Sequence, residues 1–155
     1  MIEVYVGINN VSSPQRLVDA VKTILAFEAG GDLEIKGVVV TKASGMAAQA
    51  GVPDASRLMY REGKPLILLP TLKDAVELLK PDMTLLNEQV KDSAAVCELE
   101  VPPNSRVLYV VSGHEDGFLK QELALGTPVK FAGISRYVPP AAAVALFLTE
   151  IRSLT

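Results

Sequence analysis

Polar and glycine residues follow two apolar segments in the last third of the chain, where such residues could take part in chemistry. The loop Ser112–Gly117 reads Ser-Gly-His-Glu-Asp-Gly and follows the apolar segment Val107–Val111, and the loop Gly133–Tyr137 follows Pro128–Ala132. The pair Glu115–Asp116 is the one local candidate for paired-carboxylate hydrolysis, although adjacent loop residues point apart. Ligands of open α/β sheets bind outside the carboxyl ends of the strands. We therefore expect a ligand pocket at these two loops.

Several motifs of nucleotide-binding and hydrolytic enzymes do not occur. The turn Gly7–Pro14 lacks the second and third glycines of a dinucleotide fingerprint, and no GxxxxGK[ST] phosphate loop is found. No serine stands in a GxSxG nucleophile elbow. One cysteine, Cys97, excludes an intrachain disulfide, and with one histidine, His114, it leaves too few soft ligands for a structural zinc site. We predict no metal site.

The composition indicates one globular domain. The 155 residues are 49% hydrophobic and 21% charged, with a net charge of −3, which allows a sizeable core and excludes disorder. A stand-alone nucleic-acid binder usually carries a basic excess. Glu3 interrupts any apolar region of a signal peptide, and no apolar run reaches the roughly 20 residues of a membrane span. We expect a single domain over residues 1–155, located in the cytoplasm.

Strand and helix patterns alternate along the chain and must position these loops. We expect strands at Ile2–Ile8, Ile35–Thr41, Pro65–Leu69, Thr84–Leu86, Val107–Val111 and Pro128–Ala132, and helices at Pro14–Phe27, Ala55–Arg61, Leu72–Leu79, Phe118–Leu123 and Ala141–Ile151. Ser12 or Ser13 is the expected N-cap of the first helix, and Asp54 that of the second. Residues 88–105 have no periodicity and read as a long loop. The alternation predicts a parallel sheet flanked by helices, which fits regulatory, nucleotide-binding and methyltransferase domains alike.

The last third of the chain resembles the SpoU branch of the SPOUT superfamily, the trefoil-knotted RNA methyltransferases. The segment Val110–Phe118 matches the family's strand and glycine-acidic-glycine loop, although the loop is one residue shorter. The turn Ser135–Tyr137 and the alanine-rich Ala141–Phe147 match the next motif, with Tyr137 where the family has Asn. The overall pattern also resembles a small archaeal-type SPOUT group. The resemblance covers about 45 residues well and implies a C-terminal trefoil knot.

The resemblance implies that S-adenosylmethionine is the cofactor and that loops after three strands grip it. The residues implied to bind it are Leu69, Pro70, Thr71, Ser112, Gly113, Gly117, Ile134, Ser135 and Val138. The glycines allow close backbone approach, and Leu69, Ile134 and Val138 would enclose the adenine. The family's catalytic arginine aligns with Lys22 in one register, and Arg16 lies nearer the turn, so Arg16 is the catalytic candidate. Knotted SPOUT proteins dimerise through their last and first helices, which implies a homodimer here.

The function that the resemblance implies is ribose 2′-O-methylation of RNA. The RNA partner would be a tRNA or rRNA, with a helper protein that supplies affinity. Two alternatives remain open. A non-catalytic SPOUT-like module that holds cofactor or RNA would explain Tyr137, the displaced arginine and the acidic charge. A flavodoxin-like regulatory domain needs an acidic cluster at the strand ends, and Asp19 and Asp32 are not placed for that.

Overall fold

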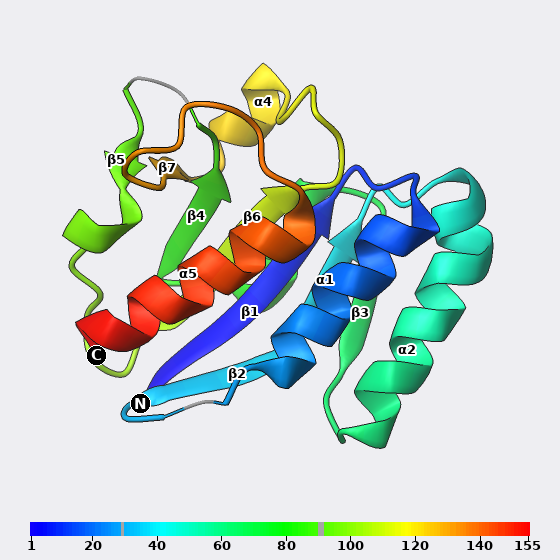
Figure 1. Ribbon diagram of the computed structural model, residues 1–155, viewed down its shortest axis with the longest axis horizontal. Helices are drawn as coiled ribbons and strands as arrows, with labels where there is room; N and C mark the ends of the chain where they lie inside the picture. Colours follow the sequence, from blue (N-terminus) through cyan, green and yellow to red (C-terminus); the bar gives the residue numbers. More distant parts are fainter. Residues whose placement is uncertain (29, 90–91) are drawn as a thin grey trace.

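The computed structural model describes residues 1–28, 30–89 and 92–155 and contains a seven-stranded sheet (Figure 1). The order across the sheet is β3-β2-β1-β6-β4-β7-β5, and every strand pair among the described residues is parallel. The strands are β1 (Ile2–Asn9), β2 (Leu33–Thr41), β3 (Leu66–Leu69), β4 (Met83–Asn87), β5 (Ala94–Ala95), β6 (Arg106–Ser112) and β7 (Thr127–Lys130). The predicted fold class, a parallel sheet flanked by helices, is confirmed.

The central strands are apolar because helices cover both of their faces. Along β6, Val107, Tyr109 and Val111 point to one core cluster, whereas Leu108 and Val110 point to a second cluster on the other face. All five side chains are buried. A strand buried on both sides reads as a continuous apolar run rather than an alternating one, which is why β6 was recognisable from sequence.

Two layers of helices pack on the sheet. The helices α1 (Pro14–Ala26), α2 (Val52–Arg61) and α5 (Pro140–Leu154) lie in front of the sheet in Figure 1, with α1 between the other two. The helices α3 (Leu72–Leu79) and α4 (Lys120–Leu123) belong to the opposite face, where their side chains form the smaller core cluster. Among the described residues, no helix combines the length and apolar character needed to cross a membrane.

The helix starts follow the capping rules only in part. Ser13 is the N-cap of α1, because its Oγ accepts a hydrogen bond from the backbone nitrogen of Arg16 at 3.2 Å. The prediction of Asp54 as the N-cap of α2 is wrong, since α2 continues from a π-helical turn at Ala47–Gly51 and begins at Val52. Thr71 caps α3 in a reciprocal capping box with Asp74.

The segment of residues 88–105, predicted to be a long loop, also contains regular structure. It carries the two-residue strand β5, which pairs with β7, and the 3₁₀ helix η2 (Val96–Glu98). Residues 90–91 of this segment lie outside the described residues. Elements this short have no periodicity in the sequence, so a pattern search could not find them.

The helix α5 is buried on one side only within a single chain. Its inner side chains, such as Phe147 and Leu148, are fully buried, whereas Ala142, Ala145 and Thr149 are exposed. The segment Ala141–Ile151 is apolar nearly all round, and one copy of the chain covers only part of that surface. The exposed strip leaves room for the predicted dimer contact, which stays a prediction.

Candidate active site at the carboxyl edge of the sheet

The carboxyl ends of β1 and β6 form the topological switch point of the sheet. The chain leaves β1 through α1 toward β2, and it leaves β6 through α4 toward β7 on the other side. The two strand ends are joined by a hydrogen bond of 2.7 Å from the backbone nitrogen of Gly113 to the carbonyl oxygen of Asn9. Ligands of open α/β folds bind in the crevice at such a point. A ligand of this chain is therefore expected at this switch point.

Arg16 reaches from α1 to the loop after β6. Its Nη1 donates to the carbonyl oxygen of Gly113 at 3.0 Å and to the Oη of Tyr137 at 3.4 Å, while its Nη2 lies 3.5 Å from the Oε1 of Glu115. The guanidinium also lies over the ring of Tyr137, 5.7 Å from its centroid. The structure therefore brings Arg16, the predicted catalytic residue, to the predicted ligand loops.

Tyr137 closes one side of this arrangement. Its Oη donates a hydrogen bond to the carbonyl oxygen of Ser112 at 2.9 Å. Burial raises the pKa of the Tyr137 hydroxyl; the nearby Arg16 acts to lower it, and Glu115 acts to raise it further. The residue that departs from the SPOUT pattern thus links the loop after β7 to the end of β6 as a neutral hydrogen-bond donor.

A hollow of about 120 Å³ opens between the ends of β4, β6 and β7. Its lining includes Asn87, Glu88, Glu115, Ser135, Arg136 and Tyr137, and it is called the carboxylate hollow below. Asn87 is 8% exposed, and its Oδ1 is buried with no hydrogen-bond partner among the described residues. A buried polar atom without a partner costs free energy. This carbonyl oxygen is therefore available to a ligand.

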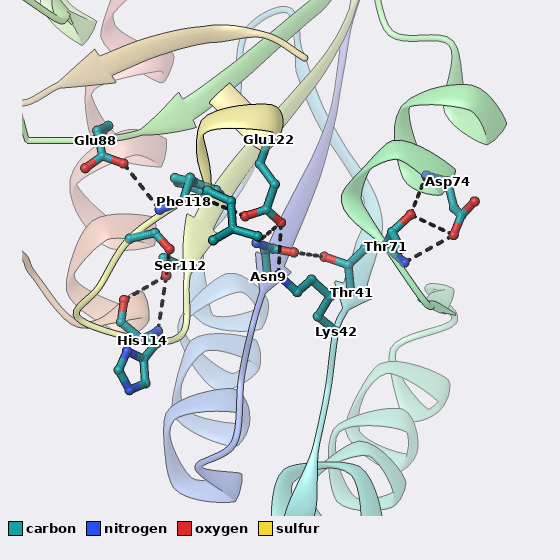
Figure 2. Close-up of polar contacts among 12 residues, drawn as sticks. Asn9, Thr41, Lys42, Thr71, Asp74, Glu88, Ser112, His114, Phe118 and Glu122 are labelled. Carbon is teal, nitrogen blue, oxygen red and sulfur yellow. Dashed lines mark hydrogen bonds and ion pairs between the residues drawn. The ribbon is translucent and has the colours of Figure 1, made fainter. Parts of the chain in front are cut away.

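Glu88 lines the carboxylate hollow and contacts the loop after β6. Its Oε2 accepts a long hydrogen bond of 3.5 Å from the backbone nitrogen of Phe118 (Figure 2). Gly117 has φ +75°, and a Cβ at this position would lie 3.1 Å from both carboxylate oxygens of Glu88. Glycine is required here for its left-handed backbone and for the close approach of the carboxylate.

Of the six predicted cofactor residues in the loops after β6 and β7, three do not line the carboxylate hollow. Ser112, Gly117 and Ser135 line the carboxylate hollow, and their contact with a cofactor stays a prediction. Ile134 and Val138 instead pack against the main core. A Cβ on Gly113 would lie 2.7 Å from the Cβ of Val11, so this glycine makes room for the chain itself.

The loop Leu69–Thr71 does not join the other predicted loops. It follows β3 at the edge of the sheet, and β2 and β1 separate it from β6. The third side of the hollow comes instead from β4, which ends at Asn87 beside β6 and β7. The order of strands across a sheet is not encoded in their periodicity, which explains this error. The polar residues directly after the apolar Leu85–Leu86 were the missed signal.

A second hollow, of about 350 Å³, lies at the same edge of the sheet and shares no lining residue with the first. It is lined by Lys42, Thr71, Leu72, Lys73, Leu119, Gln121, Glu122 and Leu125 and is called the lysine hollow below. Figure 2 shows Asn9 and Lys42 converging on the carboxylate of Glu122. The Nδ2 of Asn9 donates to Glu122 at 2.9 Å, and the Nζ of Lys42 lies 3.4 Å from the same oxygen. This network could not be predicted from the sequence, because α4 has only four residues.

Comparison with known proteins identifies the family. A model described as "RecB-family nuclease (DUF2122)" matches residues 45–150. The chain belongs to the DUF2122 family. Over 153 residues, covering 95% of this chain and 91% of the relative, it is 42% identical to a protein of Aeropyrum pernix named "Putative type II restriction enzyme ApeKORF2002P". It is 29% identical over 129 residues to "Putative type II restriction enzyme MjaORF1200P" of Methanocaldococcus jannaschii, covering 81% of this chain and 82% of that one.

Solved structures share the fold of this DUF2122 protein at low sequence identity. An rRNA methyltransferase of Sinorhizobium meliloti superposes with a TM-score of 0.72 and 18% identity, covering 98% of this chain and 56% of its own. The SpoU methyltransferase AviRb of Streptomyces viridochromogenes gives 0.72 and 14%, covering 97% and 58%. The chain spans somewhat over half the length of these two proteins. The SPOUT-like fold class is confirmed, and at this identity the likeness concerns fold alone.

The family assignment corrects the function predicted from sequence. Assignment to the SPOUT methyltransferases and the predicted RNA 2′-O-methylation are wrong, because the family model and both curated relatives describe nucleases or restriction enzymes. The two alternatives, a non-catalytic SPOUT-like module and a flavodoxin-like regulatory domain, are set aside by the same finding. The prediction of an enzyme is confirmed in this general form.

Binding of S-adenosylmethionine stays a prediction. The carboxylate hollow, at about 120 Å³, is smaller than the roughly 300 Å³ at which small-molecule sites begin. Tyr137 is one of the lining residues, and its Oη is already bonded to the carbonyl oxygen of Ser112. This arrangement does not fit the cofactor, and no reaction step is assigned to it. The RNA partner and the homodimer likewise stay predictions.

Proposed function

We propose that the chain is a metal-assisted nuclease whose centre is the carboxylate hollow. The observation that carries the proposal is the buried Oδ1 of Asn87, which has no partner among the described residues and lies in one hollow with Glu88 and Glu115. Mg²⁺ prefers carboxylate and carbonyl oxygens and is bound through one or two carboxylates, with water and substrate phosphates completing its shell. The donor set fits a single ion of this kind.

The lining of this hollow contains two carboxylates, Glu88 and Glu115. No group of three or more His, Cys, Asp or Glu side chains in the described part of the chain is placed to hold a metal. A cage made of protein ligands alone is thus not proposed. Two carboxylates and one amide oxygen leave most of the shell to water and to the phosphodiester. When bound, Mg²⁺ would polarise the phosphate and activate water.

The cationic side chains around the hollow suit a phosphodiester. Arg136 lines the hollow, and Arg16 lies against Glu115 and Tyr137 at its rim. A guanidinium can donate two parallel hydrogen bonds to phosphate oxygens. We assign to Arg16 the stabilisation of the negative charge that develops on the phosphate. Arg16 thus remains the catalytic candidate, but for phosphodiester cleavage instead of methyl transfer.

The acidic residues of α2 do not offer a competing centre. Asp54 and Glu62 stand at opposite ends of the helix, and eight residues at 1.5 Å each separate them by about 12 Å. Asp54 also pairs with Arg57 at 3.3 Å. Carboxylates at this separation cannot share one metal ion. The carboxylate hollow is therefore a better candidate than the ends of α2.

The test combines cleavage with metal binding. Purified protein is incubated with double-stranded DNA, single-stranded DNA and RNA, in Mg²⁺ and in EDTA. The variants are Glu88→Gln and Glu115→Gln, with Asp116→Asn as the matched control, since Asp116 is exposed and lies outside the hollow lining. Both glutamine variants should lose cleavage and weaken Mn²⁺ binding in a calorimetric titration, whereas the control should keep both.

Cleavage and Mn²⁺ affinity that both survive Glu88→Gln and Glu115→Gln would refute the assignment of the centre. Because the relatives are named restriction enzymes, double-stranded DNA is the expected substrate. Cleavage of RNA alone would keep the nuclease and change the substrate. A folded protein that cuts none of the three substrates under any divalent ion would remove the nuclease proposal itself.

A further inference from the structure

The lysine hollow is a site that the proposed nuclease centre does not use. It lies between α3 and α4 on the face of the sheet opposite α1, and its volume of about 350 Å³ falls in the range of small-molecule sites, roughly 300–1,000 Å³. Leu72, Leu119 and Leu125 supply apolar walls, and Leu119 is 50% exposed. A hollow with an uncovered apolar wall and polar groups along one side is the usual form of a ligand site.

The charged groups of the lysine hollow leave an excess of positive charge. Glu122 is almost fully buried, and its Oε1 accepts from the backbone nitrogen of Leu119 at 2.8 Å while its Oε2 faces Asn9 and Lys42. Among the lining residues one carboxylate is set against two lysines, because Lys73 also lines the hollow; the Nζ of Lys73 lies 3.9 Å from the exposed carboxylate of Glu77, which is outside the lining. An ammonium group has three donors. Lys42 can therefore keep its contact with Glu122 and still face an anion.

The backbone of Lys42 adds independent support. Lys42 directly follows β2 and has φ +53°, in the left-handed region that lysine rarely adopts. Such conformations persist where the surroundings hold them, and they concentrate at ligand sites. Here the strained residue directs its ammonium toward Glu122 at the wall of the hollow (Figure 2). A glycine or asparagine would relieve the strain but would remove the cation.

We propose that the lysine hollow binds a nucleotide unit, with its phosphate at Lys42 and Lys73 and its base against Leu72, Leu119 and Leu125. Thr71 and Gln121 add hydroxyl and amide groups at the same wall. The phosphate requires cations, the base requires an apolar surface, and the lining of the hollow includes both. A free mononucleotide and a residue of a nucleic-acid strand have the same chemistry, and the experiment separates these two sources.

The experiment is a calorimetric titration of the full chain with AMP, adenosine, inorganic phosphate and a single-stranded oligonucleotide. AMP should bind more tightly than adenosine or phosphate, because each of these makes only part of the contacts. Lys42→Met and Lys73→Met should each weaken AMP binding about tenfold, the usual scale of one lost charged contact. Lys22→Met, an exposed lysine on α1, is the control and should bind like the wild type.

A second set of variants protects the test against misfolding and against binding elsewhere. Lys42→Gly relieves the left-handed backbone while removing the ammonium, so it should stay folded and still lose affinity. Leu119→Ala should weaken AMP but not phosphate. Glu115→Gln, in the other hollow, should leave AMP affinity unchanged even if nuclease activity is lost, so the two sites can fail separately.

The outcomes are distinct. An oligonucleotide that binds more tightly than AMP, with the same dependence on Lys42, identifies a strand as the source, whereas the reverse order identifies a free mononucleotide. Equal AMP affinity in the wild type and Lys42→Gly overturns the proposal. Phosphate that binds as tightly as AMP, with no effect of Leu119→Ala, overturns the nucleotide assignment, since a bare anion site would then explain the data.

Discussion

The guanidinium of Arg16 on α1 lies 3.0 Å from the carbonyl oxygen of Gly113 in the loop that follows β6. The two residues are 97 positions apart in the chain. Their hydrogen bond ties the first helix to the loop that carries Glu115, and the same guanidinium contacts Tyr137. The side chain of Arg16 therefore links α1 to the loops after β6 and β7 around the proposed centre. Its removal should lower both the nuclease activity and the free energy of unfolding.

Arg16→Ala should lower nuclease turnover by roughly 10²–10³, the scale of losing one preorganised charge-stabilising donor. Arg16→Lys should recover part of this, because an ammonium keeps the charge but not the two-pronged geometry. The free energy of unfolding should fall by about 1 kcal/mol, since the bond to Gly113 is lost. Turnover and urea denaturation are measured beside Lys22→Ala, an exposed change on the same helix. Full activity of Arg16→Ala would exclude a catalytic role.

Gly113→Ala should destabilise the fold rather than block a ligand. The new Cβ would lie 2.7 Å from the Cβ and 2.8 Å from the Cα of Val11, and 2.9 Å from the carbonyl oxygen of Asn10. Backbone atoms cannot give way cheaply, and overpacking costs about 1–3 kcal/mol. Thermal unfolding should show a lower Tm than in Ser135→Ala, a change at an exposed position of the loop after β7. An unchanged Tm would contradict this prediction and would mean that the loop shifts to make room for the new Cβ.

The elements of the fold could be predicted because burial leaves a pattern in the sequence. The helix Leu72–Leu79 was predicted to the residue, and β1, β2 and β6 to within two residues at each end. Strand order leaves no such pattern, so the loop after β3 was placed beside loops from which two strands separate it. Asn87 was missed although it obeys the rule that found Ser112, a polar residue directly after an apolar run at the end of a strand.

The chemistry of the site was harder to predict than its place. Lys42 follows the apolar segment Val38–Val40, so a search for polar strand ends would have found it, but its strained backbone is visible only in the structure. Glu122 has no signal at all, because a four-residue helix has no amphipathic period. The fold resemblance predicted the architecture correctly and the activity wrongly, as expected when one fold supports unrelated functions.

Tyr109→Phe should not destabilise the protein at neutral pH. The Oη of Tyr109 is buried with no hydrogen-bond partner among the described residues, while its ring stacks on Phe147 with centroids 3.7 Å apart. Phenylalanine keeps the stacking and removes the unsatisfied hydroxyl, so the free energy of unfolding should stay the same or rise by about 1 kcal/mol. Urea denaturation measures it, with Tyr60→Phe as an exposed control. A loss above 1 kcal/mol would show that the hydroxyl is bonded.

The same variant should alter the response to alkali. Burial, and then the carboxylate of Glu150, raise the pKa of Tyr109 well above its usual value. Because the pKa is higher in the folded chain than the roughly 10 of the unfolded chain, the stability is fully present below pH 10 and is lost as the pH rises further. Denaturation at pH 7 and above pH 10 should therefore show a smaller loss for Tyr109→Phe than for the wild type.

Ala145→Glu should separate a homodimer into monomers if the outer strip of α5 is its interface. Ala145 is exposed in one chain, so the change should not unfold the monomer. Leu148 is fully buried in the core, so the corresponding Glu variant would unfold the chain whatever its oligomeric state. In a two-fold interface the same surface of both subunits is buried, so the two introduced glutamates lie in one interface. Burying unpaired charges there costs several kcal/mol. Sedimentation at micromolar concentration should show a dimer for the wild type and a monomer for Ala145→Glu.

The matched control, Leu78→Glu, places the same charge on an exposed apolar position of α3 and should stay dimeric. A wild-type protein that sediments as a monomer contradicts the homodimer, and an Ala145→Glu variant that stays dimeric moves the interface to another surface.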